Sequence, residues 1–199
     1  LNAYPNRRIA GIPYRVAVEA EALGTAGAIR FAAQEMQLEE TFLVLNGDVL
    51  TDLDIGALVE FHDQHEAEAT IALQAVSDPS RFGVVRTDDN GQVEEFIEKP
   101  PAGKSPSNHI NAGTYVINPS VVDRIPEDRP VSIERETFPE MVKAGTLYAM
   151  QSDTYWLDTG TPGQFLEANL DVLQGRRKNK PVMPVAIVHP AARIEESVI

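Results

Sequence analysis

Phe42-Leu43-Val44-Leu45-Asn46-Gly47-Asp48 is an apolar run that ends in turn residues and a carboxylate. Four consecutive apolar residues before a turn are typical of a buried strand. The stretch Tyr155-Trp156-Leu157-Asp158-Thr159-Gly160-Thr161-Pro162 likewise leads from apolar residues to an aspartate, with turn residues next to it. Each stretch therefore predicts an aspartate at the carboxyl edge of a sheet, where open α/β sheets bind ligands.

Two aspartates at one sheet edge, Asp48 and Asp158, could share a divalent cation. Mg2+ favours one or two carboxylates completed by substrate phosphates, so the pair points to phosphate chemistry. Trp156 would share a strand face with Asp158 and form an aromatic wall beside it. The alternative for each aspartate is an ordinary turn residue, because Asp is common in turns.

The sequence around these stretches alternates between strand and helix patterns. Residues 14–19 alternate like a strand, and Leu23-Gly24-Thr25-Ala26-Gly27 leads into an Ala-rich helix. Asp54 is placed as the N-cap of a helix whose apolar residues recur with helical spacing. This order of strand, helix, strand and helix predicts an α/β fold with parallel crossovers.

From residue 69 onward strands dominate the pattern. Asp88-Asp89-Asn90-Gly91 predicts a hairpin turn, and Pro139 should kink a helix expected over residues 132–144. Thr161 with Gln164 fits a capping box at the start of a last helix. Further strands are expected over residues 70–76, 83–87, 93–98, 113–117 and 147–151, and a short helix after Asn118.

Composition limits the classes of protein to which the chain can belong. Its 199 residues, 43% of them hydrophobic, suffice for one full α/β domain. A net charge of −13 argues against a nucleic-acid-binding face. No Cys is present, which excludes disulfides and thiolate zinc sites and makes a cytoplasmic location the expectation. No run reaches the ~18 apolar residues of a membrane span, so we expect no membrane partner.

Three regions are predicted along the chain. Residues 1–175 form the main domain, and the basic residues of 176–186 indicate an exposed linker. Residues 187–199 are β-branched and repeat-like, as at the beginning of a β-helix, although one turn cannot establish a repeat. Because the chain begins without Met, we expect that an N-terminal piece precedes it.

Two further strings carry residues suited to bind a ligand. Glu98-Lys99 closes a strand and is either a plain charge pair or a site in which Glu98 binds polyol hydroxyls and Lys99 a phosphate. Asn111 opens a strand, and its amide could bind a sugar hydroxyl or hold a turn.

The Gly24-Thr25 turn and a pair of histidines are less specific. Free N–H groups at the start of a helix favour anions, yet close helix packing explains the small residues of this turn equally well. His62 and His65 are three residues apart on a helix and could share a metal, but no third ligand is apparent, so an ordinary helix face is favoured.

Taken together and in order, six strings resemble the sugar-1-phosphate nucleotidyltransferases. The resemblance runs from about residue 14 to residue 173, and it implies a Rossmann-like, mixed, mainly parallel sheet flanked by helices. Ser132-Ile133-Glu134-Arg135-Glu136-Thr137-Phe138-Pro139 looks most like the mannose-1-phosphate guanylyltransferases within that family, and the trailing segment resembles the start of their left-handed β-helix. The strings are Leu23-Gly24-Thr25-Ala26-Gly27, Asn46-Gly47-Asp48, Phe82-Gly83-Val84-Val85, Phe96-Ile97-Glu98-Lys99-Pro100, Asn111-Ala112-Gly113-Thr114-Tyr115 and Trp156-Leu157-Asp158-Thr159-Gly160-Thr161-Pro162.

The resemblance implies a magnesium-dependent reaction in which a sugar 1-phosphate attacks the α-phosphorus of a nucleoside triphosphate. Such catalysis depends on alignment and charge neutralisation. GTP and mannose 1-phosphate are the favoured substrates. By the resemblance, the metal is held by Asp48 and Asp158, the base and ribose lie against Gly24 and Thr25, the sugar meets Gly83, Glu98 and Asn111 and borders Glu134, and Lys99 meets the phosphate.

The family's glycine-rich loop, with its arginine and a following Lys-Pro, does not occur in this sequence. It would stand upstream of Leu1, so we expect these 199 residues to be inactive by themselves.

Other functions stay open at this stage. The substrates could be glucose 1-phosphate with dTTP or UTP, and the protein could be a non-catalytic relative that binds nucleotide sugar. A generic glycosyltransferase would use an Asp-x-Asp motif, for which only Asp52-Leu53-Asp54 is available. Self-association is plausible, because an incomplete core would expose apolar edges.

Overall fold

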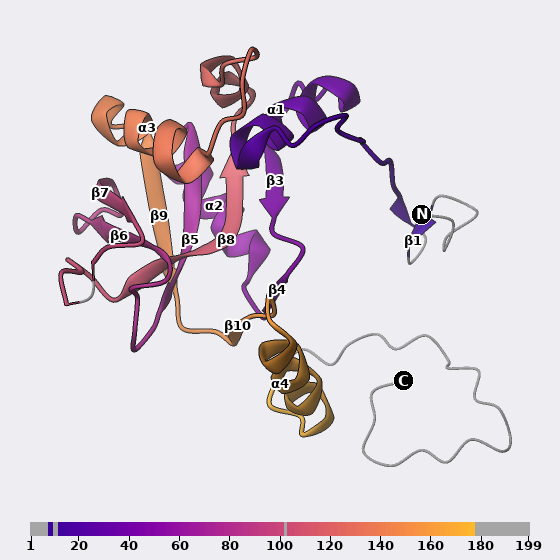
Figure 1. Cartoon of the computed structure of the whole chain (residues 1–199). Coiled ribbons are helices and arrows are strands. Elements are labelled where there is room, and N and C mark those ends of the chain that lie inside the picture. The colour runs from indigo at the N-terminus through magenta and orange to yellow at the C-terminus, as the bar shows by residue number, and fades with distance from the viewer. Residues whose placement is uncertain (1–7, 10–11, 102, 178–199) are drawn as a thin grey trace, which may run out of the picture.

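The computed structural model describes residues 8–9, 12–101 and 103–177 (Figure 1). Within them, a six-stranded sheet carries helices on both faces and has the strand order β7-β6-β8-β5-β9, with β3 paired to β8. The strands of this sheet are β3 (Phe42–Leu45), β5 (Ala69–Ala75), β6 (Gly83–Thr87), β7 (Val93–Glu98), β8 (His109–Ile117) and β9 (Leu147–Ser152). The helices are α1 (Gly24–Met36), α2 (Ile55–Gln64), α3 (Phe138–Ala144), α4 (Pro162–Leu173), the 3₁₀ helix η1 (Pro119–Arg124) and the π-helical turn η2 (Ile133–Thr137).

Two short strand pairs lie outside this sheet. β1 (Arg8–Ile9) pairs with β2 (Ile12–Pro13), and β4 (Val49–Thr51) pairs with β10 (Trp156–Asp158), both antiparallel. In Figure 1, β4 and β10 lie between the main sheet and α4, at the end of the molecule opposite α1 and α3. This second pair carries the site described below.

The mixed sheet flanked by helices confirms the predicted α/β class, but fewer neighbouring strands are parallel than expected. β3, β5 and β9 run in one direction, yet β8 lies between β3 and β5 and runs against both. Among the described strands, β5 and β9 are the only parallel neighbours. The hairpin between β6 and β7 is antiparallel by necessity, because a tight turn reverses the chain.

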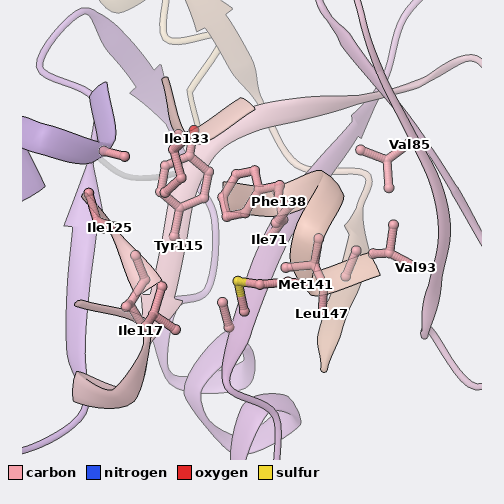
Figure 2. Packing of buried hydrophobic residues seen from close by; sticks show 14 of the residues in the cluster. Ile71, Val85, Val93, Tyr115, Ile117, Ile125, Ile133, Phe138, Met141 and Leu147 are labelled. Atoms are coloured by element: carbon pink, nitrogen blue, oxygen red, sulfur yellow. The ribbon is translucent and has the colours of Figure 1, made fainter. Parts of the chain in front are cut away.

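The two faces of the sheet bury separate clusters of side chains. Along β5, Ile71 contributes to the larger cluster with α1 and α3, whereas its neighbour Ala72 packs on the other face with Leu58 of α2. This alternation follows from the two-residue period of a strand. In the larger cluster, the rings of Tyr115 and Phe138 meet edge to face at 5.3 Å between centroids (Figure 2).

Local signals in the sequence were mostly confirmed. Asp54 caps α2 by accepting a hydrogen bond from the Ala57 N–H at 3.0 Å. Pro139 lies in the first turn of α3, directly after η2, so the expected helix is divided as predicted. The strand expected over residues 14–19 is wrong: these residues have no regular structure, because no described strand pairs with them.

The end of the described chain also differs from the expected exposed linker. Arg176 is half exposed, but only 14% of the Arg177 side chain is accessible, and its guanidinium forms an ion pair with Asp52. Residues 178–186 of the linker and the β-helix expected over 187–199 lie outside the described residues. None of the described helices is both long and apolar enough to cross a membrane.

Candidate active site

Asp48 and Asp158 are brought together by the pairing of β4 with β10. Asp158 lies opposite Val49 in this pair, so Asp48 is the next residue beyond the register. The backbone N–H and the hydroxyl of Thr159 both donate to the Asp48 carbonyl oxygen, at 2.8 and 2.9 Å. These bonds fix the backbone on which the two carboxylates stand.

Gly160 shows how close the two carboxylates are. Its N–H donates to Asp158 Oδ1 at 2.8 Å. A Cβ placed on Gly160 would lie 3.0 Å from Asp158 Oδ1 and 3.6 Å from Asp48 Oδ2. The two aspartates, 110 residues apart in sequence, therefore face the same small space beside a residue that has no side chain.

A β-bulge in β8 forms the wall next to this carboxylate pair. The register of β5 against β8 shifts between Ile71 and Leu73, where β8 carries extra residues around Gly113 at φ +75°. The Asn46 N–H donates to the Gly113 carbonyl at 2.8 Å, and Trp156 Nε1 donates to the Ala112 carbonyl at 2.9 Å. Bulges re-aim backbone groups beside active sites, and this one ties β3 and β10 to the same edge.

A hollow of about 120 Å³ opens between these elements. Two aromatic rings, Phe82 and Trp156, meet edge to face beside it at 5.8 Å between centroids. The aromatic wall predicted next to Asp158 is thus present. The hollow is lined by Asn46, Asp48, Val49, Phe82, Asn111, Ala112, Gly113, Trp156 and Asp158.

Gly83, Glu98 and Lys99 form a second group at the end of the β6–β7 hairpin. Gly83 lies opposite Glu98 in the register, and a Cβ on Gly83 would come within 2.9 Å of Glu98 Oε2. Lys99 has a left-handed backbone (φ 51°), an uncommon conformation for a residue with a side chain. Its ammonium group is largely exposed and lies 3.8 Å from Glu98 Oε1.

Glu134 belongs to the same region and is held by two hydroxyl groups. Thr25 Oγ1 donates to Glu134 Oε2 at 2.8 Å, and Ser132 Oγ donates to the same oxygen at 2.7 Å. Burial raises the pKa of the Glu98 carboxyl, and the negative charge of Glu134 raises it further. The two carboxylates are therefore electrostatic neighbours across β7 and η2.

Tyr115 connects the two groups of residues. Asn111 Nδ2 donates to Tyr115 Oη at 2.9 Å, and the Gly113 N–H donates to Asn111 Oδ1 at 3.0 Å. Burial is the main cause that raises the pKa of Tyr115 well above its usual value, and the charges of Glu134 and Glu98 add to it. Tyr115 is therefore a neutral, buried phenol that orients the Asn111 amide.

Asn46, Phe82 and Tyr115 occur in the six sequence strings given above, but the sequence did not identify them as site residues. Asn46 directly precedes the Gly47-Asp48 turn, and Tyr115 lies four residues after Asn111. The position after an apolar strand was the signal for Asn46, although the expected buried strand is wrong in one respect: β3 is only half buried, and Leu43 and Leu45 are exposed. No pattern indicated that Tyr115 would support Asn111, because that contact depends on the bulge.

Two of the N–H groups at the start of α1 are used by the fold rather than left open to an anion. The Ala26 and Gly27 N–H groups both donate to the Val131 carbonyl, at 3.0 and 3.4 Å. Gly24 is required for this approach, since a Cβ on it would lie 2.5 Å from that carbonyl oxygen. Close packing thus explains these small residues, and a role for Gly24 and Thr25 toward base and ribose stays a prediction.

The remaining candidates are used by the fold. His62 is buried and its Nδ1 bonds to the Thr70 hydroxyl at 2.9 Å, while His65 stacks on Phe61. Within the described part of the chain, no three His, Cys, Asp or Glu side chains form a metal-binding group. In the Asp-x-Asp string, Asp54 caps α2 and Asp52 pairs with Arg177, so neither aspartate faces the hollow.

The sequence matches the model of the nucleotidyl transferase family over residues 4–175. The chain belongs to this family. Among its relatives, the mannose-1-phosphate guanylyltransferase catalytic subunit beta of Drosophila melanogaster is 44% identical over 89% of this chain. That alignment covers 50% of the fly protein, so the chain spans about half the length of the curated relative that it matches.

Solved structures show the same fold. A Bacillus anthracis protein described as a glucose-1-phosphate thymidylyltransferase superposes with a TM-score of 0.70 at 26% identity. The superposition covers 79% of this chain and 64% of that one. HddC from Yersinia pseudotuberculosis, complexed with GMP-PN, superposes with a TM-score of 0.65 at 27% identity, over 82% of this chain and 68% of that one.

Proposed function

We propose that the protein transfers a guanylyl group from GTP to mannose 1-phosphate, giving GDP-mannose and pyrophosphate. The family, the name of the fly relative and the guanine-nucleotide analogue bound by HddC support this choice. The observation that carries the proposal is the meeting of Asp48 and Asp158 around Gly160, next to the aromatic hollow.

The residues around Gly160 fit a magnesium ion. Two carboxylates converge there, and Mg2+ is commonly bound by one or two carboxylates together with substrate phosphates. When bound, the ion would neutralise phosphate charge and orient the phosphates for displacement. In this proposal, Asp48 and Asp158 hold it.

The reaction is a displacement at phosphorus. An oxygen of the sugar phosphate forms a bond to the α-phosphorus of GTP, the bond from that phosphorus to the bridging oxygen breaks, and pyrophosphate leaves with the electron pair. Lys99 contacts the negatively charged sugar phosphate, for which an exposed ammonium group beside the hairpin end is suited. No protein nucleophile is needed, because alignment and charge neutralisation supply most of the acceleration.

The sugar is bound between the two groups of residues. The Glu98 carboxylate accepts hydrogen bonds from its hydroxyls and the Asn111 amide donates to them, while Gly83, which has no side chain, lets Glu98 lie close against β6. Glu134, held by Thr25 and Ser132, borders this space. Carboxylates in fixed positions can distinguish hydroxyl orientations, because a misplaced hydroxyl leaves a buried polar group unpaired.

The test measures pyrophosphate release by the protein as its complete natural gene encodes it. GTP, UTP and dTTP are each combined with mannose 1-phosphate and glucose 1-phosphate in the presence of Mg2+. We expect the highest rate with GTP and mannose 1-phosphate. A higher rate with glucose 1-phosphate and dTTP, the pair implied by the name of the Bacillus anthracis protein, would keep the reaction and replace the substrates. No release from any pair would contradict the proposal.

Three further expectations accompany this function. The partners are the two small-molecule substrates, the location is cytoplasmic, and the protein can self-associate. Fluorescence microscopy of the tagged protein tests the location, and sedimentation of the purified protein tests self-association.

A further inference from the structure

The strand pair that carries the two aspartates is short. β4 and β10 pair over only three positions, Trp156 with Thr51, Leu157 with Leu50 and Asp158 with Val49. A two-stranded ribbon of this length is not stable by itself in water. Contacts outside the pair must therefore hold its register, on which the separation of the Asp48 and Asp158 carboxylates depends.

At the end of the pair away from the carboxylates, Arg177 contacts the last residue of β4 and the residues next to the two strands. Its Nε and Nη2 donate to Asp52 Oδ1 at 3.0 and 2.7 Å, and Nη2 also donates to the Thr51 carbonyl at 3.0 Å. The guanidinium carbon lies 5.8 Å from the centroid of the Tyr155 ring. Arg177 thus joins the residues that follow β4 to the residue that precedes β10.

This contact is buried and lies beside hydrogen bonds that join the same residues. The accessible fractions of the Arg177 and Asp52 side chains are 14% and 2%. The Asp52 N–H and the Thr51 hydroxyl both donate to the Tyr155 carbonyl, at 2.9 and 3.2 Å. Because a planar guanidinium can satisfy a carboxylate and a carbonyl at fixed angles, it constrains the geometry more than a single charge would.

Arg176 provides a natural comparison. It is adjacent in sequence but pairs with Asp171 at the end of its own helix, and about half of its side chain is exposed. Its other hydrogen bonds go to Gln174 and to the Asp171 carbonyl, and the Asp171 carboxylate also accepts a hydrogen bond from the Tyr155 hydroxyl at 2.7 Å. The two arginines therefore carry the same charge at nearly the same place, but Arg177 bonds directly to Thr51 of β4, whereas Arg176 is linked to Tyr155 through Asp171.

We propose that Arg177 is a positioning residue for the metal site. Its contacts with Asp52, Thr51 and Tyr155 fix the register of β4 against β10. That register in turn sets the spacing of Asp48 and Asp158. This role rests on the proposed function, because it assumes that the two aspartates bind the ion. Arg177 thereby connects the segment after α4 to the metal site at the other end of the strand pair.

Two measurements test this role in the complete protein, each on Arg177→Ala, Arg177→Lys and the control Arg176→Ala. Hydrogen exchange of the peptide that contains Thr159 reports the register, since the Thr159 N–H is bonded to the Asp48 carbonyl. Electron paramagnetic resonance of Mn2+, used as a stand-in for Mg2+, reports the affinity of the ion. Peptides from β5 serve as an internal reference for global unfolding.

We expect Arg177→Ala to speed exchange at Thr159 and to weaken Mn2+ binding about tenfold, within the range seen when outer-shell partners of metal sites are removed. Arg177→Lys keeps the charge but lacks the planar fork, so it should fall between Arg177→Ala and the wild type. Arg176→Ala leaves the bonds of Arg177 in place, so it should change both readouts much less than Arg177→Ala does. If Arg177→Ala does not fold, Arg177→Lys is judged by the same two readouts.

Unchanged exchange at Thr159 in the folded Arg177 variants would overturn the proposal. Faster exchange with unchanged Mn2+ affinity would also overturn it, because Arg177 would then have a structural role only. A separate measurement tests the metal site itself. If Asp48→Asn binds Mn2+ as tightly as the wild type, the two aspartates do not form the metal site, whatever the role of Arg177.

Discussion

Gly83 lies directly against Glu98, so closely that a Cβ on Gly83 would come within 2.9 Å of Glu98 Oε2. The two residues pair across β6 and β7. The same Cβ would lie 2.8 Å from the Phe96 ring. The absence of a side chain at residue 83 therefore sets the position of the carboxylate that we assign to the sugar.

Replacing Gly83 by Ala should raise the KM for the sugar 1-phosphate by about tenfold, because Glu98 or the Phe96 ring must move by a large fraction of an ångström. Steady-state kinetics with the sugar phosphate varied measures this effect. Gly163→Ala is the matched control, since nothing lies within 4 Å of a Cβ at that position. An unchanged KM in Gly83→Ala would contradict the placement of the sugar beside Glu98.

Glu98→Gln should stabilise the fold at neutral pH while it weakens sugar binding. Burial, with the charge of Glu134 added, raises the pKa of Glu98 in the folded protein. A raised pKa contributes stability at low pH that is lost as the pH rises through the folded-state value, so the charged carboxylate opposes folding at pH 7. Gln has no such charge.

Urea unfolding of wild type and Glu98→Gln at a series of pH values measures this difference. The advantage of the variant should be largest near pH 7 and should shrink as the pH falls toward about 4, the usual pKa of an exposed Glu. A variant less stable than the wild type at pH 7 would show that Glu98 supports the fold rather than the ligand.

His62 should give the stability curve a second pH-dependent region. Burial lowers its pKa, and the neighbouring Asp63 opposes this only in part. A lowered pKa contributes stability above the unfolded value of about 6.5, and this is lost as the pH falls through the folded value. The wild type should therefore lose stability below about pH 6.5, while His62→Gln should lose less over the same range. Equal slopes for the two proteins in urea unfolding would be inconsistent with a buried neutral imidazole.

The elements that local chemistry determines could be predicted from the sequence. The strands β6 and β7 have the predicted bounds, and Asp54 caps α2 as expected. Asp48 and Asp158 were selected because each ends an apolar, strand-like stretch and precedes turn or helix-start residues. Such signals depend only on residues close together in the chain, so the residue types and their spacing are enough to predict them.

The parts that depend on distant contacts could not be predicted. β8 enters between β3 and β5, and its bulge at Gly113 forms one wall of the hollow. No local sequence pattern predicts which strand will lie between two others in a sheet. The buried position of Arg177 was missed for the same reason, because its partner Asp52 is 125 residues away and the surrounding sequence is basic and polar.

The bulge itself can be tested at Gly113, which has φ +75°. A Cβ there would lie 2.8 Å from Asn46 Nδ2, so Gly113→Ala combines backbone strain with a contact against the site. We expect a loss of about 2 kcal/mol in the free energy of unfolding and reduced pyrophosphate release. Gly103→Ala is the control, because Gly103 has a similar φ of +73° but open space around it. Equal losses in both variants would mean that backbone strain alone, and not Asn46, accounts for the effect.

The proposed transfer requires that Asp48 and Asp158 together hold the metal ion. Pyrophosphate release with GTP, mannose 1-phosphate and Mg2+, compared between wild type, Asp48→Asn, Asp158→Asn and the exposed control Asp153→Asn, tests it most directly. We expect each of the first two variants to lose at least about a hundredfold in rate while remaining folded, because each removes charge from the metal site, and Asp153→Asn to be unaffected. Wild-type rates in folded Asp48→Asn or Asp158→Asn would contradict it.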